Sequence, residues 1–165
     1  MKIPWIFYGT LGFAFVAVRS VVSLATCPDS WIAFHESCYF FAQHESASFN
    51  EAEHFCQAHG AHLITIDDVH ENNFVLSVVE DHIGVLWWIG LTDSITEGEW
   101  KWIPSDESPS FTFWDEGQPE DHSSRDQDCV ALHNSFHYKW HDDVCTMKHP
   151  PICEKPSGSE VVTIG

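Results

Sequence analysis

The chain has 165 residues, of which 44% are hydrophobic and 14% aromatic, including eight Trp. This apolar content is enough for one domain with a packed core and excludes a disordered chain. The 25 acidic residues outnumber the 7 Lys and Arg and give a formal net charge of −18. Such acidity argues against a nucleic-acid partner, because phosphate binding needs a basic surface.

Residues 1–25 have the pattern of a signal peptide. Lys2 supplies a positive start, residues 3–18 are mostly apolar, and Ser23 and Ala25 are the small residues expected before a cleavage site. The alternative is a membrane anchor, but the apolar run is too short to span a bilayer before Arg19 interrupts it. We therefore expect cleavage, secretion, and no membrane insertion after cleavage.

The next part of the chain predicts a pair of strands and a helix. Residues 30–41 alternate loosely between apolar and polar and predict one or two strands. Residues 48–60 predict a helix, because Ser48 and Glu51 have the spacing of a capping box and Gly60 can end the helix.

A short strand and a second helix should follow. Residues 61–66 are strand-like, and residues 67–84 have helical spacing, with Asp68 near the start and Gly84 at the end. The expected buried stripe of this helix consists of Phe74, Val75, Val78 and Val79.

The second half of the chain is rich in strands. Apolar or alternating runs predict strands at 85–91, 99–103, 129–132 and 150–155. Five tryptophans lie on or beside these strand patterns and are expected in the core: Trp87, Trp88, Trp100, Trp102 and Trp140. Residues 104–128 lack periodicity and predict a long functional loop, and residues 156–165 resemble a flexible tail. This order of elements indicates an α+β domain over residues 26–155.

All six cysteines follow the expected cleavage point, which is typical of disulfides in an exported protein. Six cysteines allow fifteen pairings. Spacing suggests one of them: Cys27 with Cys38 as a clip on a hairpin, Cys129 with Cys145, and Cys56 with Cys153.

The stretch "GQPEDHSSRDQDC" gathers oxygen-bearing side chains next to a cysteine, and "KWHDDVC" follows it. The side chains are Gln118, Glu120, Asp121, Asp126, Gln127 and Asp128, with Asp142 and Asp143 further on. Carboxylates this close in sequence repel each other unless a cation lies among them. A hard dication such as Ca²⁺ is the candidate.

These motifs together resemble the C-type lectin-like domain family, in its long form with an extra N-terminal hairpin. The matching features are the order of the cysteines, "WWIGL", "LTDSITEGEWKW", "GQPE", "DCVAL" and "WHDDVC". The resemblance implies two helices, two antiparallel sheets, a long calcium-binding loop, the three disulfides above, and a cis peptide bond before Pro119.

The resemblance also implies two calcium sites. The auxiliary site matches four carboxylates: Asp93, Glu97, Asp121 and Asp128. The sugar-binding site matches Gln118, Glu120 and Asp142, but His141 stands where the family has Asn, and Gln127 stands where it has Glu. Asp126 could take the role of that missing Glu. We therefore expect Gln118, Glu120, Gln127, His141 and Asp142 to contact carbohydrate.

A zinc site was considered for His137 and His141, which are four residues apart. On a strand these side chains would be about 13 Å apart, too far to share one metal ion.

The sequence thus predicts a secreted, calcium-dependent lectin for microbial or cell-surface glycans, with possible homo-oligomerisation. In the family, Glu-Pro-Asn is typical of mannose-type sites and Gln-Pro-Asp of galactose-type sites. Gln118-Pro119-Glu120 is nearer to the second, although Glu is one methylene longer than Asp, whereas His122 is typical of mannose-type loops, so the two signals conflict. The alternative is a domain of the same fold that binds a protein ligand without calcium. An enzyme is not expected, because no nucleophile lies in a recognisable strained turn.

Overall fold

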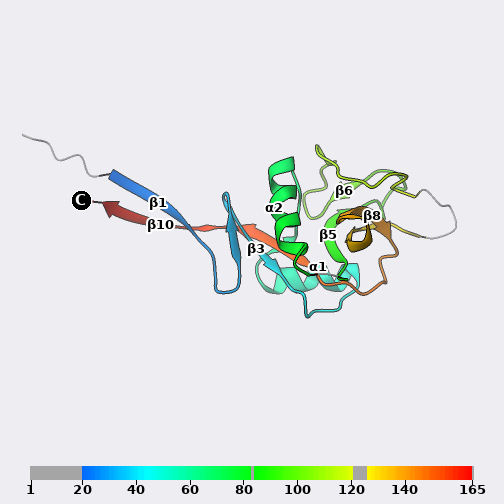
Figure 1. Cartoon of the computed structure of the whole chain (residues 1–165), viewed down its shortest axis with the longest axis horizontal. Coiled ribbons are helices and arrows are strands. Elements are labelled where there is room, and N and C mark those ends of the chain that lie inside the picture. The colour runs from blue at the N-terminus through cyan, green and yellow to red at the C-terminus, as the bar shows by residue number, and fades with distance from the viewer. Residues whose placement is uncertain (1–19, 83, 121–125, 165) are drawn as a thin grey trace, which may run out of the picture.

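The structure is a computed structural model that describes residues 20–82, 84–120 and 126–164. It contains the two helices and the two antiparallel sheets that the sequence predicts (Figure 1). One sheet has the order β2 (Ile32–Phe34), β3 (Ser37–Phe41), β9 (Ile152–Pro156) and β4 (His62–Leu63). The other has the order β6 (Lys101–Trp102), β5 (Trp87–Thr92), β7 (Cys129–His133) and β8 (Lys139–Asp143).

Helix α1 (Phe49–Ala58) begins at the expected capping box. The Ser48 backbone N–H donates to Oε2 of Glu51 at 2.8 Å, which satisfies one of the unpaired groups at the start of the helix. Just beyond the helix, Gly60 has a φ of +67°, a left-handed conformation that glycine adopts without strain.

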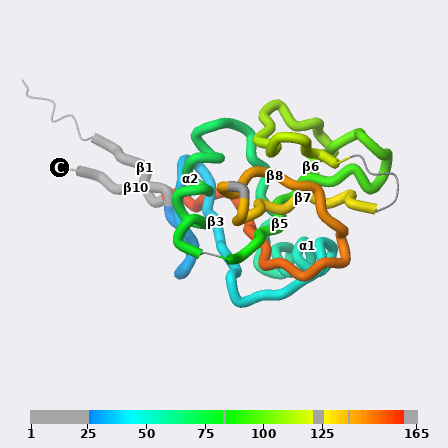
Figure 2. The backbone as a smooth tube through the Cα atoms, turned by 45° about the vertical axis from the view of Figure 1, so that its right-hand side comes forward, coloured from blue at the N-terminus to red at the C-terminus, as the bar shows by residue number. Residues whose placement is uncertain are grey.

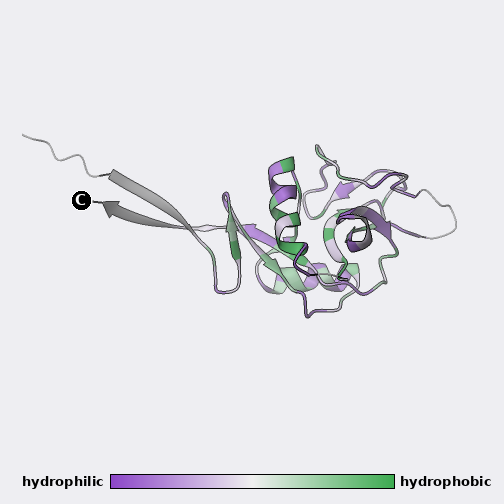
Figure 3. Ribbon diagram, in the orientation of Figure 1, coloured by the Kyte–Doolittle hydropathy of each residue, from purple (hydrophilic) through white to green (hydrophobic). Residues whose placement is uncertain are grey.

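Helix α2 (Val69–Val79) begins after Asp68, whose side chain accepts hydrogen bonds from the N–H groups of His70 and Glu71. It ends before the predicted Gly84, because the chain turns at residues 80–82. Val75 and Val79 are buried as expected, whereas Phe74 and Val78 are only partly buried. The colouring of α2 in Figure 3 shows the mixture of apolar and polar residues that a helix with one buried face needs.

The tryptophans of the strand patterns form the core. Trp87, Trp88, Trp102 and Trp140 are all at most 2% exposed, and Trp100 is partly buried against the same core. Every residue of β5 is buried, which explains why its sequence is continuously apolar rather than alternating.

Three disulfides confirm the expected pairing. Cys27 bonds to Cys38, Cys56 to Cys153, and Cys129 to Cys145. The first closes the hairpin of β2 and β3, the second joins α1 to β9, and the third joins β7 to the segment after β8. The third bond therefore restrains the end of the long loop.

Outside the domain, β1 (Ser20–Thr26) pairs along its whole length with β10 (Gly158–Ile164). Figure 1 shows this ribbon projecting from the end of the domain away from the β5–β8 sheet. Within the domain, Figure 2 shows β5, β7 and β8 side by side, with α1 next to β5. The structure thus has a strand where the sequence suggested a flexible tail over 156–165. Cleavage after Ala25 would remove nearly all of β1, so the ribbon can form only in the uncleaved chain. The signal peptide remains a prediction, and so does a flexible tail in the cleaved chain. Residues 1–19 lie outside the described part.

Among the helices of the described residues, none has the length and hydrophobicity that crossing a bilayer requires.

Candidate functional site

The long loop is anchored to β8 at its middle. The Trp140 N–H donates to the carbonyl of Phe113 at 2.9 Å, and the Asp115 N–H donates to the carbonyl of Trp140 at 3.2 Å. The ring of Trp114 lies between two other indoles, at 5.0 Å from Trp100 and 5.8 Å from Trp140. Because of these contacts, the residues that follow Asp115 start from a fixed position beside β8.

The turn after this anchor contains the expected cis peptide bond between Gln118 and Pro119. The Gln118 N–H donates to the carbonyl of Asp115 at 3.0 Å. The Glu120 N–H donates to Oδ1 of Asp142 at 3.0 Å and lies 3.2 Å from Oε1 of Gln118. The turn therefore places the side chains on both sides of the proline next to β8.

All five residues expected to contact carbohydrate line one cavity of about 270 Å³. They come from three segments that are separate in sequence: Gln118, Glu120, Gln127, His141 and Asp142. Leu86, Ala131, His133 and Asp143 complete the wall. The fold thus brings together the set that the motifs suggested.

Asp142 is the most buried acid of this cavity, at 6% exposed. Its pKa is raised, first by burial and then by the negative charges of Glu120 and Asp93, although the hydrogen bond from Glu120 acts in the opposite direction. The Nε2 group of Gln127 donates to the backbone carbonyl of Asp142 at 3.3 Å. Oε1 of Gln127 is buried and accepts no hydrogen bond from the described residues. Buried, mutually repelling oxygens of this kind fit a bound cation.

His141 also lines the cavity, but Asp115 holds its ring. Nε2 of His141 lies 3.4 Å from Oδ2 of Asp115, and the His141 and His133 rings pack with their centroids 4.9 Å apart. Burial and the neighbouring His133 lower the pKa of His141. Lys139 donates to Asp115 at 3.1 Å and lowers the pKa of that carboxyl.

Two residues of the expected auxiliary site, Asp93 and Asp128, meet beside the start of β7. Asp93 is 4% exposed, its Oδ2 accepts a hydrogen bond from the Gly98 N–H at 2.9 Å, and its own N–H donates to the carbonyl of Asp128 at 3.2 Å. Glu97 is exposed. Asp121 lies outside the described residues, so its position is untested.

Two further expectations concern individual residues. Asp126 is exposed and does not line the cavity, whereas its neighbour Gln127 does. His137 does not lie on a strand: it follows the short 3-10 helix Asn134–Phe136 in a left-handed conformation. The imidazole that packs on His141 is therefore that of His133.

Within the described residues, no three His, Cys, Asp or Glu side chains converge closely enough to suggest a metal site by themselves. The lining of the cavity also includes the amide side chains of Gln118 and Gln127, which carry oxygens of another type. These are ligands that Ca²⁺ accepts.

Sequence reasoning missed Asp115 and His133. Asp115 holds His141 and Lys139, and its position after Trp114 in a loop gave no signal of this contact. His133 reaches the cavity because β7 continues one residue past the predicted strand end at 132.

The chain was compared with known proteins. The model of the lectin C-type domain family matches residues 45–155. Human C-type lectin domain family 10 member A is 36% identical over 138 residues, covering 80% of this chain. The perlucin-like protein of Mytilus galloprovincialis is 30% identical over 121 residues, covering 72% of this chain. The carbohydrate-recognition domain of the mouse scavenger receptor C-type lectin superposes with a TM-score of 0.72 at 32% identity, covering 80% of this chain and 98% of that domain.

The chain therefore belongs to the C-type lectin domain family. It has the family's fold, and the family binds carbohydrate rather than catalysing reactions, which agrees with the expectation that the chain is not an enzyme. The chain spans 41% of the length of the human relative and 76% of that of the perlucin-like protein.

Proposed function

We propose that the chain is a secreted lectin whose sugar binding depends on calcium. The observation that supports this most directly is the cavity in which the buried carboxylate of Asp142 meets Glu120, Gln118 and Gln127. Burial, together with the negative charges of Glu120 and Asp93, raises the pKa of Asp142 and so disfavours its ionised form. A divalent cation bound among these oxygens would offset that cost.

The residues that would hold the ion are Gln118, Glu120, Gln127 and Asp142. When bound, Ca²⁺ supplies open coordination positions that accept sugar hydroxyls directly. The protein side chains fix the orientation of the sugar, since carboxylate and amide groups can also hydrogen-bond its hydroxyls. Asp93, Glu97, Asp121 and Asp128 would hold a second, structural calcium.

The glycan preference follows from the pair that flanks Pro119. Gln118 and Glu120 favour galactose-type sugars over mannose-type ones, although His122, outside the described residues, is typical of the latter. Binding of a single hexose is weak, so useful strength requires several sites acting together. We propose microbial or cell-surface glycans as targets, and homo-oligomers as one way to gain avidity.

The test is chromatography on galactose and mannose resins. We expect retention in calcium, release by EDTA, and recovery when calcium is restored, with stronger retention on galactose. Retention that ignores EDTA contradicts the calcium mechanism. Failure to bind any member of a glycan array would favour the protein-ligand alternative, for which the engagement of His141 by Asp115 is the supporting observation.

A further inference from the structure

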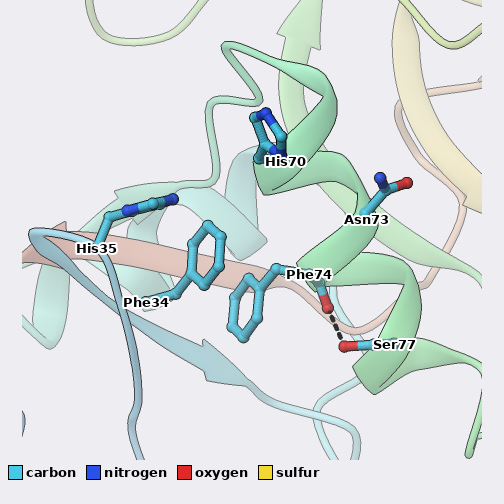
Figure 4. A pocket seen from close by; sticks show the side chains of 6 residues that line it. All are labelled: Phe34, His35, His70, Asn73, Phe74 and Ser77. Atoms are coloured by element: carbon cyan, nitrogen blue, oxygen red, sulfur yellow. Dashed lines mark hydrogen bonds between the residues drawn. The ribbon is translucent and has the colours of Figure 1, made fainter.

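A second cavity, of about 610 Å³, lies on a different part of the domain (Figure 4). Its wall is made by the turn of the β2–β3 hairpin and one face of α2. The lining residues are Phe34, His35, His70, Asn73, Phe74 and Ser77. We call this cavity the aromatic pocket. The proposed calcium site uses none of these residues.

The floor of the aromatic pocket is a pair of stacked phenyl rings. The rings of Phe34 and Phe74 are nearly parallel, with centroids 4.4 Å apart and an interplanar angle of 4°. Phe74 also packs on the buried Tyr39 at 5.0 Å, and the Cys27–Cys38 disulfide closes the hairpin that carries Phe34. The floor is therefore held in place from both sides and is preformed.

Polar side chains surround this floor. The side chains of His35, His70 and Asn73 are exposed, and among the described residues none of them forms a side-chain hydrogen bond. Ser77 differs, because its hydroxyl donates to the carbonyl of Phe74 at 2.6 Å. His35 is held at a φ of +49°, an uncommon conformation for a residue other than Gly, and its ring packs at 4.1 Å on Phe34.

The lining has no Asp, Glu, Lys or Arg, although the chain has a net charge of −18. Two acids lie near the lining residues of α2: Asp68 just before the helix and Glu71 within it. Oδ1 of Asp68 accepts from the N–H groups of His70 and Glu71 at 2.7 and 2.9 Å, and Glu71 accepts from the Tyr39 hydroxyl and the Asp67 N–H. Both carboxylates are therefore already hydrogen-bonded within the protein, and the lining itself offers a charged ligand no group of opposite fixed charge. A wholly apolar ligand would cover the imidazoles and the amide without offering them partners, which costs free energy.

The ligand that fits these constraints is neutral, has one apolar face, and has hydroxyls at its edge. A hexose ring has this construction: its C–H groups lie flat on an aromatic surface, while its hydroxyls can both donate to and accept from imidazole and amide groups. A cavity of this volume lies within the range of ligand sites.

We propose that the aromatic pocket is a second carbohydrate site, which binds a neutral hexose unit without any metal. It differs from the cavity around Asp142, which is lined by residues of β7, β8 and the turn around Pro119. With two sites, one chain can bridge two glycans, or two branches of one glycan, and so gain avidity without forming an oligomer.

The experiment is a two-dimensional amide NMR titration of the oxidised domain in EDTA with methyl β-galactoside and methyl α-mannoside. We expect saturable shift changes confined to residues 34–37 and 69–77, at concentrations on the order of millimolar for a single hexose. The variant His70→Ala/Asn73→Ala should lose them. The matched control is His54→Ala/Asn50→Ala, which removes the same residue types from the exposed surface of α1 and should leave the changes intact.

Two results would overturn the proposal: no saturable change with either sugar, or changes that persist in His70→Ala/Asn73→Ala. Because the titration is done in EDTA, its result is independent of the calcium site. Failure of that other site would appear separately, as the absence of calcium-induced shifts around Asp142.

Discussion

The backbone N–H of Glu120 donates a hydrogen bond to Oδ1 of Asp142 across the cavity, at 3.0 Å. This bond joins the turn after Pro119 to strand β8, so residues 22 positions apart in sequence meet before any ligand arrives. The same carboxylate is buried, and its pKa is raised by burial and by the negative charges of Glu120 and Asp93. A cation bound beside it would offset the cost of ionising it.

Replacing Asp142 by Asn tests that balance. Burial raises the pKa of Asp142, so this carboxyl contributes stability at pH values below its unfolded pKa, and the contribution is lost as pH rises through the folded pKa. Asn at this position cannot ionise, so the variant does not bear this loss. We expect Asp142→Asn to unfold in EDTA at the same temperature as the parent protein or above it, because the amide keeps an oxygen for Glu120.

In calcium we expect the parent protein to be more stable than Asp142→Asn. At a calcium concentration ten times Kd, the parent protein gains about 1.4 kcal/mol by mass action, and the variant gains little. Thermal unfolding of both proteins in EDTA and in calcium measures the two effects. Equal stabilisation of the two proteins by calcium would show that Asp142 does not hold the ion.

The change His141→Asn replaces an imidazole by an amide oxygen donor, which suits Ca²⁺ better. It also releases Asp115 from its contact with the ring. We expect tighter calcium binding and longer retention on galactose resin. Asp115→Asn is the control, since it loosens His141 without adding a ligand at position 141. Unchanged retention of His141→Asn would mean that position 141 does not contribute to the site.

Glu71 predicts a pH dependence that is independent of calcium. Its pKa is raised, chiefly by burial, although Tyr39 donates to it at 2.6 Å and the Asp67 N–H at 2.9 Å. The stability that this carboxyl contributes is therefore present in acid and is lost as pH rises through its folded pKa. Gln at position 71 cannot ionise. The stability of Glu71→Gln relative to the parent protein should therefore increase as pH rises from roughly 4, the ordinary range for Glu, towards neutrality.

Melting temperatures of the two proteins in EDTA across this pH range give the measurement. Contributions from titrating groups that do not interact with Glu71 cancel in the difference, whereas Glu154 and Asp67 interact with it. A difference that stays constant with pH would mean that Glu71 ionises normally in the folded state.

The disulfides should differ in their effects on stability and on binding. Cys129 and Cys145 are 16 residues apart, and Cys56 and Cys153 are 97 apart. In the chain-entropy model, removing the first bond costs about 3 kcal/mol and removing the second about 4.7 kcal/mol. The shorter loop borders the cavity, so Cys129→Ser/Cys145→Ser should lose sugar binding even at a temperature where it remains folded. Denaturant unfolding and resin retention together test this, and retained binding would contradict it.

Much of the fold was predictable because it depends on local signals. The capping box at Ser48 and the acidic cap at Asp68 both start helices where expected, and the apolar run of β5 is buried throughout. The ends of elements were less accurate: the predicted strand over 61–66 keeps strand pairing only at His62–Leu63. The ribbon of β1 and β10 could not be foreseen, because its two strands lie at opposite ends of the chain.

The residues of the site were likewise predictable only where a short sequence motif contains them. Gln118, Glu120 and Asp142 were identified by their motifs, and the fold brings them together. Asp115 was missed because its role depends on the anchoring of Trp114 against β8, a contact between distant segments that no short pattern encodes. The aromatic pocket was missed for a similar reason, since Phe34 and Phe74 come from separate elements and meet only after folding.

The most direct test is a calorimetric titration of calcium into the oxidised, EDTA-stripped protein, followed by galactose. We expect saturable heat with a Kd on the order of 10⁻⁴ to 10⁻³ M, the range of extracellular calcium modules, and a sugar heat that appears only after calcium. We also expect Asp142→Asn to abolish both signals. If the protein gave no heat at a calcium concentration about ten times the weakest of these Kd values, and its melting temperature did not change, calcium binding at this site would be contradicted.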